Sequence, residues 1–151
     1  MRYLGLDYGE KTVGVALSDA LLLTAQPYET IFRKEENKLR RTLARIEEIC
    51  VQQEVSKIIL GLPLSMDGSD SKTTEKARAF QVMVERRTGL PVLLQDERLT
   101  TVEADEILKE MEVPASERKA YIDKIAAAVI LREYMNREGA GETSLPEEKE
   151  I

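Results

Sequence analysis

Along the first third of the chain, short hydrophobic runs are separated by polar turns, a pattern typical of neighbouring β-strands. The run Arg2–Asp7 ends in the turn-like cluster Tyr8–Lys11, and a second run, Thr12–Ser18, follows at once. The two runs predict a hairpin. A third strand is expected over Gln26–Phe32, where Pro27 indicates an edge position or the entry to the strand.

Farther along the chain, the spacing of the hydrophobic residues changes. Apolar residues recur at helical spacing between Glu35 and Gln53, which predicts a helix, and a second helix is expected after the loop Ser65–Ser71. Short apolar runs bounded by Gly and Pro predict strands over Lys57–Leu60 and Val92–Gln95. Strands and helices therefore alternate in this part of the chain.

The last third of the chain predicts two more helices and a tail. Thr100 and Glu103 have the spacing of a capping box, so a helix is expected from Thr100 to the break at Pro114. The segment Tyr121–Tyr134 is apolar nearly all round and predicts a buried helix. From Glu138 onward the composition is typical of a disordered tail. The expected organisation is one domain, residues 1–137, and an acidic tail, residues 138–151.

The expected order of elements is βββαβαβαα. Three sequential strands favour antiparallel pairing, whereas the later alternation of strands and helices favours parallel crossovers. An α/β fold satisfies both conditions, with a mixed five-stranded sheet and helices packed on it.

Composition limits the chemistry that this domain can perform. The 151 residues are 42% hydrophobic and 33% charged, with no histidine and one cysteine, Cys50. Histidine-based triads and zincin-type sites are therefore excluded, and Cys50 is expected to be buried packing. Any catalytic metal would have oxygen ligands, which favours Mg²⁺ or Mn²⁺. Neither a membrane span nor a signal peptide is predicted, so we expect a cytoplasmic protein without membrane contacts.

Three segments place carboxylates at the ends of expected core elements. In the first, strand alternation puts Tyr3, Gly5 and Asp7 on one face of the sheet, with Asp7 at the carboxyl end of its strand. Gly5 and Gly9 leave space beside this carboxylate. One interpretation gives Asp7 a catalytic role, and the alternative is that it caps the hairpin turn.

The second segment contains adjacent acids, Asp96 and Glu97, directly after the strand Val92–Gln95. If the strand continues, the two side chains point to opposite faces, so one of them at most faces Asp7. Glu97 has the longer reach and is favoured. The alternative is that both acids interact with the dipole of the following helix.

In the third segment, Asp123 shares a helical face with Ala126 and Ala127. A carboxylate at that position is costly to desolvate unless a cation or strong donors meet it. The alternative is that Asp123 lies in the first turn of the helix. Together, Asp7, Glu97 and Asp123 would repel one another without divalent metal, as in a two-metal phosphoryl-transfer site.

A fourth segment, Gly61–Ser71, joins a strand to the start of a helix. Free backbone N–H groups and the helix dipole at such a junction can bind a phosphate. The candidate side chains are the hydroxyls of Ser69 and Ser71 and the amine of Lys72. The alternative is an ordinary serine-capped helix after a glycine turn.

Four blocks of sequence together resemble the YqgF (RuvX-like) family. They are Gly5–Gly9 with Lys11 and Gly14–Asp19, then Gly61–Ser71, then Asp96–Thr101, and then Asp123–Ala127. The blocks occur in family order and span almost the whole chain before the tail. The family is described as Holliday-junction-resolvase-like nucleases and as nucleases that mature the small-subunit (16S) ribosomal RNA precursor. The resemblance implies an RNase H-like fold and a metal-dependent endonuclease that cuts structured nucleic acid.

The resemblance also implies roles for individual residues. Asp7, Glu97 and Asp123 would hold two Mg²⁺ or Mn²⁺ ions, with Asp7 bridging both and with Asp96 as an additional candidate acid. The ions would activate a water for in-line attack on phosphorus. The side chains expected to contact phosphate oxygens are Lys11, Arg98 and Lys124. Each of these three could equally be a solvated surface charge.

The expected substrate is the ribosomal RNA precursor, with four-way DNA as an alternative, and the ribosome is a further expected partner. A monomer and a homodimer both fit the sequence. Two other functions stay open. An actin-like or sugar-kinase ATPase shares the opening Asp7-Tyr8-Gly9, although such enzymes normally need two domains of this kind. A non-catalytic ribosome or transcription factor would use the same fold for binding alone.

The net charge of −6 argues mildly against binding to nucleic acid. The charge is unevenly distributed, however. The tail from Glu138 carries −4, whereas residues 33–45 contain six bases and two acids. This basic run is either a solvated face or a candidate patch for binding a phosphate backbone.

Overall fold

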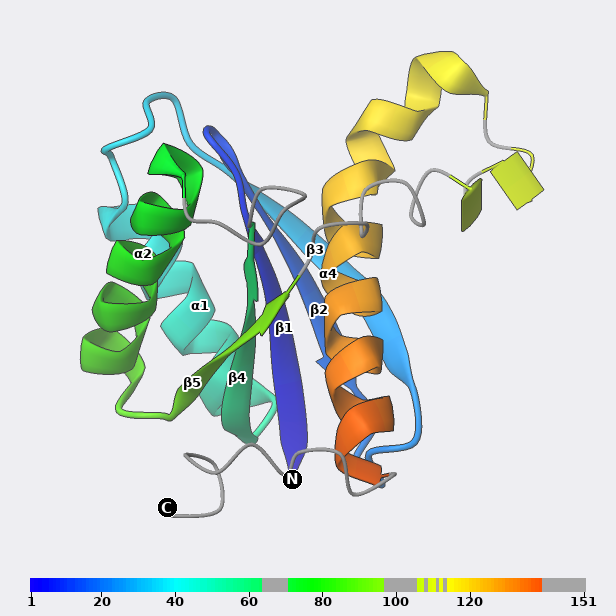
Figure 1. Ribbon diagram of the computed structural model, residues 1–151. Coiled ribbons are helices and arrows are strands. Elements are labelled where there is room, and N and C mark those ends of the chain that lie inside the picture. Colours follow the sequence, from blue (N-terminus) through cyan, green and yellow to red (C-terminus); the bar gives the residue numbers. More distant parts are fainter. Residues whose placement is uncertain (64–70, 97–105, 108, 111, 113, 140–151) are drawn as a thin grey trace.

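The computed structural model describes residues 1–63, 71–96, 106, 107, 109, 110, 112 and 114–139 of the chain. Its elements are β1 (Arg2–Tyr8), β2 (Thr12–Ser18), β3 (Ala25–Phe32), α1 (Arg40–Gln52), β4 (Val55–Leu62), α2 (Lys72–Thr88), β5 (Val92–Asp96) and α4 (Ala115–Gly139). The strands form one sheet in the order β3-β2-β1-β4-β5, with α1 and α2 on one face and α4 on the other (Figure 1). The predicted α/β architecture with a mixed five-stranded sheet is confirmed.

The directions of the strands decide where their ends meet. β1 pairs antiparallel with β2, and β2 pairs antiparallel with β3, whereas β4 is parallel to both β1 and β5. Parallel neighbours need a long crossover, and α1 and α2 provide the two crossovers. The carboxyl ends of β1, β4 and β5 consequently lie together, at what we call the carboxyl edge of the sheet.

Strand alternation divides the buried side chains into two layers. Leu4 and Leu6 of β1 belong to the larger core, which includes residues of α1 and α2. Tyr3 belongs to a second core, which includes residues of α4. Gly5 and Asp7 lie on the same face of β1 as Tyr3. The central strand therefore stabilises the larger core with one face and meets α4 with the other.

The helix expected between Glu35 and Gln53 begins later than predicted, at Arg40. The guanidinium of Arg33 donates its Nε–H to the carbonyl oxygen of Glu36 at 3.0 Å. In a helix that started at Glu35, this carbonyl would accept from the N–H of Arg40. Residues 33–39 therefore form a loop before α1.

Helix α4 has 25 residues and extends beyond the expected segment Tyr121–Tyr134 in both directions. It includes Glu138 and Gly139, which the sequence pattern assigned to the tail, because Glu138 forms an ion pair with Lys57 at 3.0 Å. The start of the helix expected from Thr100 and the rest of the tail lie outside the described residues. Within the described ranges, no helix is long and apolar enough to cross a membrane.

Candidate active site

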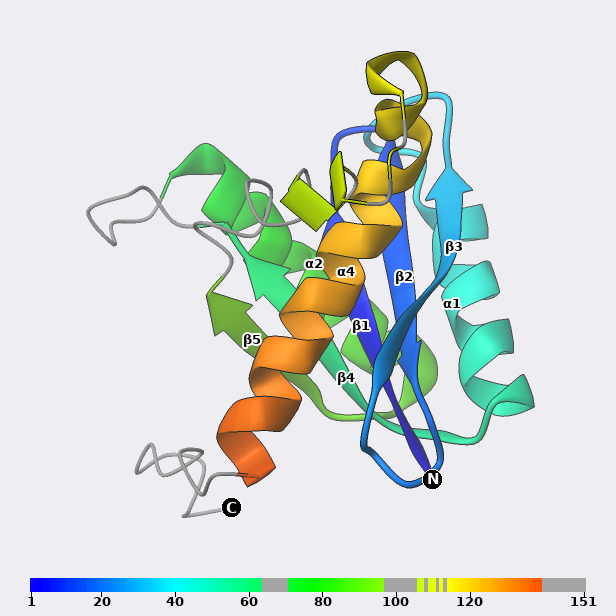
Figure 2. The same cartoon turned by 90° about the vertical axis from the view of Figure 1, so that its right-hand side faces the viewer.

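Helix α4 lies diagonally across the sheet, over β2 near its amino end and toward β4 and β5 near its carboxyl end (Figure 2). Two glycines of the sheet allow a close approach. A Cβ atom on Gly14 of β2 would overlap the carbonyl oxygen of Asp123, and a Cβ on Gly5 of β1 would lie 2.8 Å from the carbonyl oxygen of Ala127. The backbone of the helix is therefore in direct contact with both strands.

The contact at Gly14 brings two of the predicted acids to one place. Asp7 is the residue opposite Gly14 in the β1–β2 ladder, and it lies on the face of the sheet that α4 covers. Asp123 contacts the same glycine from α4. Both acidic residues are half-buried. Because opposed residues of an antiparallel pair have Cα atoms about 5 Å apart, Asp7 and Asp123 are neighbours at the carboxyl edge.

A threonine fixes the orientation of the Asp123 carboxylate. Thr12, the first residue of β2, donates its hydroxyl hydrogen to Oδ2 of Asp123 at 2.7 Å. Hydrogen bonds to a charged oxygen are among the stronger ones in proteins. Thr12 thus acts in the way that outer partners orient the ligands of a metal ion.

The structure decides the interpretation of Asp123 and places Asp7 within its strand. α4 begins at Ala115, about two turns before Asp123, so the first-turn interpretation of Asp123 is wrong. The β1–β2 turn is closed by the N–H of Gly9, which donates to the carbonyl oxygen of Thr12 at 2.7 Å. Asp7 precedes this turn and stays in the ladder as a strand residue.

The acids at the end of β5 are separated by strand alternation. Gln95 lies on the α4 face, where its Oε1 accepts a hydrogen bond from Nη1 of Arg137 at 3.0 Å. Alternation then directs Asp96, the last residue of β5, to the face opposite that of Asp7. Glu97, the favoured acid of the pair, lies outside the described residues.

Among the residues expected to contact phosphate, Ser69 and Arg98 also lie outside the described residues. Ser71 is the N-cap of α2, and its hydroxyl accepts from the N–H of Thr74 at 3.3 Å. The N–H of Ser71 in turn donates to Oγ1 of Thr74 at 3.1 Å. This capping box is the ordinary helix start that was the alternative for this serine. Lys72 is exposed in the first turn of α2.

Two of the predicted lysines adjoin the site. Lys11 is exposed in the β1–β2 turn, next to Thr12. Lys124 follows Asp123 on α4, and its Nζ lies 5.2 Å from the centroid of the Tyr121 ring, a cation–π contact. Each of these two lysines therefore directly neighbours, along the chain, one of the two residues joined by the hydrogen bond between Thr12 and Asp123.

Reasoning from the sequence did not identify the roles of Thr12 and Gly14 in building the site. Thr12 and Asp123 are 111 positions apart, and nothing in the sequence connects them. Gly14 does carry a signal, because a glycine inside a strand often marks a place where another backbone comes close. Read in that way, Gly14 predicts a close neighbour for β2, although not which one.

The donor chemistry of the site fits a hard divalent cation. Asp7 and Asp123 offer carboxylate oxygens, which are the ligands that Mg²⁺ and Mn²⁺ prefer. Two neighbouring carboxylates disfavour each other's ionisation unless a cation compensates them. Among the described residues, no group of three potential ligands gathers at one point. The expected third ligand, Glu97, is not one of those residues.

The single cysteine has a structural role. Cys50 is a residue of α1 that is 6% exposed and belongs to the larger core. Burial, with a smaller effect from Glu47, raises the pKa of its thiol to about 12. The nucleophilic thiolate is therefore scarce at neutral pH, and the prediction that Cys50 is buried packing is confirmed.

The sequence matches known proteins over most of its length. Residues 1–137 match the family model RuvX, described as Holliday junction resolvase. A protein of Lachnospira eligens, named "Putative pre-16S rRNA nuclease", is 57% identical over 135 residues, which are 89% of this chain and 96% of that protein. A protein of the same name from Agathobacter rectalis is 51% identical over 136 residues, 90% of this chain and 95% of that protein.

Solved structures share the fold at low sequence identity. RuvC of T. thermophilus in complex with a Holliday junction substrate has a TM-score of 0.60 at 15% identity, over 92% of this chain and 96% of that chain. The Holliday junction resolvase of fowlpox virus has a TM-score of 0.54 at 15% identity, over 90% of this chain and 99% of that chain. These likenesses show the fold alone, and they confirm the predicted RNase H-like architecture.

Proposed function

The chain belongs to the RuvX family of Holliday junction resolvases, and from that premise we propose that it is a divalent-metal-dependent endonuclease that matures the precursor of 16S ribosomal RNA. The meeting of Asp7 and Asp123 at Gly14 carries the proposal. The family match includes both acids, and the relatives that are 57% and 51% identical are named for this activity.

In this proposal, Asp7, Asp123 and Glu97 hold Mg²⁺ or Mn²⁺. A pair of such ions, when bound, supplies activation of water and stabilisation of the leaving oxygen in phosphodiester hydrolysis. Asp96 is left out of the ligand set because alternation along β5 directs it to the other face of the sheet.

The residues of the chain have separate tasks in this site. Asp7 presents its carboxylate from a central strand that is paired on both sides. Thr12 is a positioning residue, since it holds Oδ2 of Asp123. Lys11 and Lys124 bind phosphate oxygens of the substrate, because positive side chains at the rim of the site attract the nucleic-acid backbone.

Sequence identity ranks RNA before DNA as the substrate. The relatives named for ribosomal RNA are more than half identical to this chain over nearly their full length. The RuvC chain bound to a Holliday junction is 15% identical. Four-way DNA is the second candidate, and the description of the family favours it.

The test is cleavage by the purified protein with Mn²⁺ or Mg²⁺, in which a precursor 16S rRNA fragment and a four-way DNA junction are presented side by side. We expect the RNA to be cut. Asp7→Asn and Asp123→Asn should each lower the rate by at least about 1,000-fold, which corresponds to about 4 kcal/mol of activation free energy. Glu133→Gln, which changes an exposed acid on α4, is the matched control and should leave the rate unchanged.

Two further measurements support this test. Circular dichroism shows whether each variant keeps its fold, and calorimetric titration with Mn²⁺ measures metal binding without cleavage. Asp7→Asn should fold normally and bind Mn²⁺ more weakly than the wild type. Cleavage that survives both aspartate substitutions or EDTA would contradict the proposal, whereas cutting of the junction alone would replace RNA by DNA as the substrate.

A further inference from the structure

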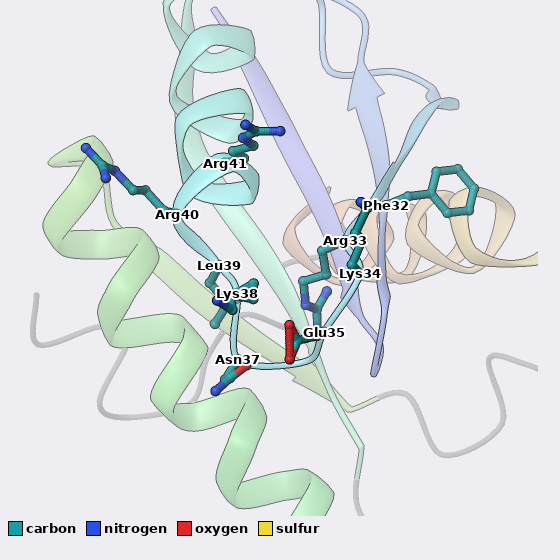
Figure 3. Close-up of a pocket in the computed structure, with 9 residues that line it drawn as sticks. All are labelled: Phe32, Arg33, Lys34, Glu35, Asn37, Lys38, Leu39, Arg40 and Arg41. Carbon is teal, nitrogen blue, oxygen red and sulfur yellow. The ribbon is translucent and has the colours of Figure 1, made fainter.

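The loop between β3 and α1 forms a basic cavity. Residues 32–35 and 37–41 line a hollow of about 750 Å³ (Figure 3). Among the described residues in this lining, Glu35 is the one acid, and five are basic: Arg33, Lys34, Lys38, Arg40 and Arg41. The whole chain has a net charge of −6, so the positive charge is a local feature. We call this surface, residues 32–41, the basic loop.

Four of the five basic side chains lack a partner within the described part of the chain. Arg33 is engaged, because it donates to the carbonyl oxygens of Gly9 and Glu36 and lies 4.9 Å from the centroid of the Tyr8 ring. The other four are exposed, and their side chains make neither a hydrogen bond nor an ion pair with a described residue: Lys34, Lys38, Arg40 and Arg41. An uncompensated cluster of this kind produces a positive potential that attracts polyanions.

An exposed aromatic residue lies at the end of β3, beside the cavity. Phe32, the last residue of β3, is 72% exposed and belongs to the lining, and its ring projects outward from β3, away from the hollow (Figure 3). Proteins that bind single-stranded nucleic acid combine such rings with cations, because the bases stack on the ring while the cations bind the phosphates. Bases inside a duplex are not available for this stacking. The combination therefore favours a single strand over a duplex.

The basic loop contacts the β1–β2 turn. The N–H of Arg33 donates to the carbonyl oxygen of Lys11 at 2.9 Å, and its guanidinium donates to the carbonyl oxygen of Gly9. The same turn leads into Thr12, which holds Asp123. The basic loop lies beside the β1–β2 turn on the side of the sheet that α1 and α2 cover (Figure 1), and the two acids lie at the same edge on the face that α4 covers. A strand of nucleic acid that crosses this turn reaches both.

We propose that the basic loop binds an unpaired segment of the RNA substrate next to the point of cleavage. In this arrangement an unpaired base stacks on Phe32, and the phosphates that flank it bind the four basic side chains that have no partner among the described residues: Lys34, Lys38, Arg40 and Arg41. The inference rests on the proposed function for the identity of the nucleic acid as RNA. It adds a second contact surface, which selects single-stranded RNA beside the cleaved structure.

The first experiment measures binding without cleavage. The anisotropy of a fluorescein-labelled oligouridine 12-mer is followed in EDTA over a range of salt concentrations. Four phosphate contacts to a single strand predict a slope of about −3 for log affinity against log salt. Arg40→Gln/Arg41→Gln should weaken binding and change the slope to about −1.5. The matched control is Arg86→Gln/Arg87→Gln in the last turn of α2, which should keep both the affinity and the slope.

The second experiment uses the absence of tryptophan from the chain. Phe32→Trp creates a single fluorescent reporter, whose emission should be quenched by the oligouridine and left unchanged by a blunt RNA duplex. Phe32→Leu should weaken binding by about 5- to 100-fold, the range for losing one stacked base, and Phe32→Trp should retain the affinity.

These results distinguish the inference from the proposed function. Normal oligouridine binding by a protein that fails to cut RNA would leave the basic loop in place and remove the nuclease proposal. The inference would be overturned if the Arg40/Arg41 and Arg86/Arg87 variants lost the same amount of affinity for oligouridine. It would also be overturned if the tryptophan emission of Phe32→Trp responded to the duplex as strongly as to the single strand. The proposed nuclease activity would stand under either of these two outcomes.

Discussion

The two ends of α4 meet the sheet in opposite ways. At the carboxyl end, a lysine of β4 lies near two tyrosine rings and pairs with a glutamate of the helix, so the buried charge has a partner. At the amino end, the helix backbone rests on Gly14 and brings Asp123 next to Asp7, so two like charges share one place. The two ends thus differ in their tasks: one end secures the helix, and the other end holds the two acids of the proposed site.

The carboxyl end is held by what we call the lysine cluster: Tyr3, Lys57, Tyr134 and Glu138. The Lys57 amine donates to the Tyr134 hydroxyl and to Glu138, both at 3.0 Å, and the Tyr3 hydroxyl donates to Glu138 at 2.9 Å. Burial alone would lower the pKa of Lys57, but its hydrogen bonds to Tyr134 and Glu138 outweigh burial and raise that pKa. The Lys57 amine therefore stays charged at neutral pH.

Gly14→Ala should have the largest effect of the variants at the two ends of α4, because it acts directly on the contact between β2 and the amino end of the helix. The new methyl group would overlap the carbonyl of Asp123, so α4 has to move. We expect a loss of about 1–3 kcal/mol in the free energy of unfolding and a fall in cleavage of about 100-fold, since a displacement of about 1 Å can have that effect. Urea unfolding and a cleavage assay measure the two quantities.

The control for this variant lies at the other end of the same helix. A Cβ on Gly139 would meet nothing within 4 Å, so Gly139→Ala should leave both the stability and the cleavage rate essentially unchanged. If Gly14→Ala were as stable and as active as Gly139→Ala, the close approach of α4 to β2 would be needed for neither stability nor cleavage.

Thr12→Val should have an intermediate effect, because it changes the surroundings of Asp123 without moving the helix. The substitution keeps the shape of the side chain and removes the hydrogen bond to Oδ2 of Asp123. We expect cleavage and Mn²⁺ affinity to fall by about 10- to 100-fold, as for other partners that orient metal ligands, and the free energy of unfolding to fall by about 1 kcal/mol or less. Thr12→Ser retains the hydroxyl and should restore activity; failure of this rescue would argue against a positioning role.

Lys57→Met should have the smallest effect and should act on stability alone. Lys57 and Glu138 are 23% and 31% exposed in their side chains, so we expect a loss of only about 1 kcal/mol in the free energy of unfolding. The loss should be constant between about pH 6 and 9, because a raised lysine pKa contributes fully at any pH below the unfolded value of about 10.4. Unfolding at several pH values tests this, and a fall in cleavage comparable to that of Thr12→Val would contradict the division of tasks.

The mixed sheet could be predicted from the sequence because it depends on local patterns. Alternating hydrophobic residues, glycine and proline breaks, and helical spacing are all set by neighbours in the chain. The positions of Asp7 and Asp123 on their elements followed from the same patterns. The start of α1 did not, because it depends on the contact of Arg33 with Glu36, a side-chain interaction that competes with the helix.

Contacts between distant segments mark the limit of the sequence prediction. The hydrogen bond between Thr12 and Asp123 and the ion pair between Lys57 and Glu138 join residues that are far apart in the chain. The local sequence around each of these residues does not predict its partner. Ser71 shows what local patterns can give, since the serine-capped helix start was one of the two interpretations of its loop, and its hydroxyl does cap α2.

The diagonal path of α4 has a consequence for the newly made chain. Asp7 belongs to the first strand and Asp123 to the last described helix, so a ribosome has to synthesise almost the whole domain before the two carboxylates can meet. The sheet can pair earlier, but the face that carries Gly5 and Gly14 stays uncovered until α4 docks. Nascent chains that lack α4 would therefore lack the meeting of Asp7 and Asp123 on which the proposed site rests.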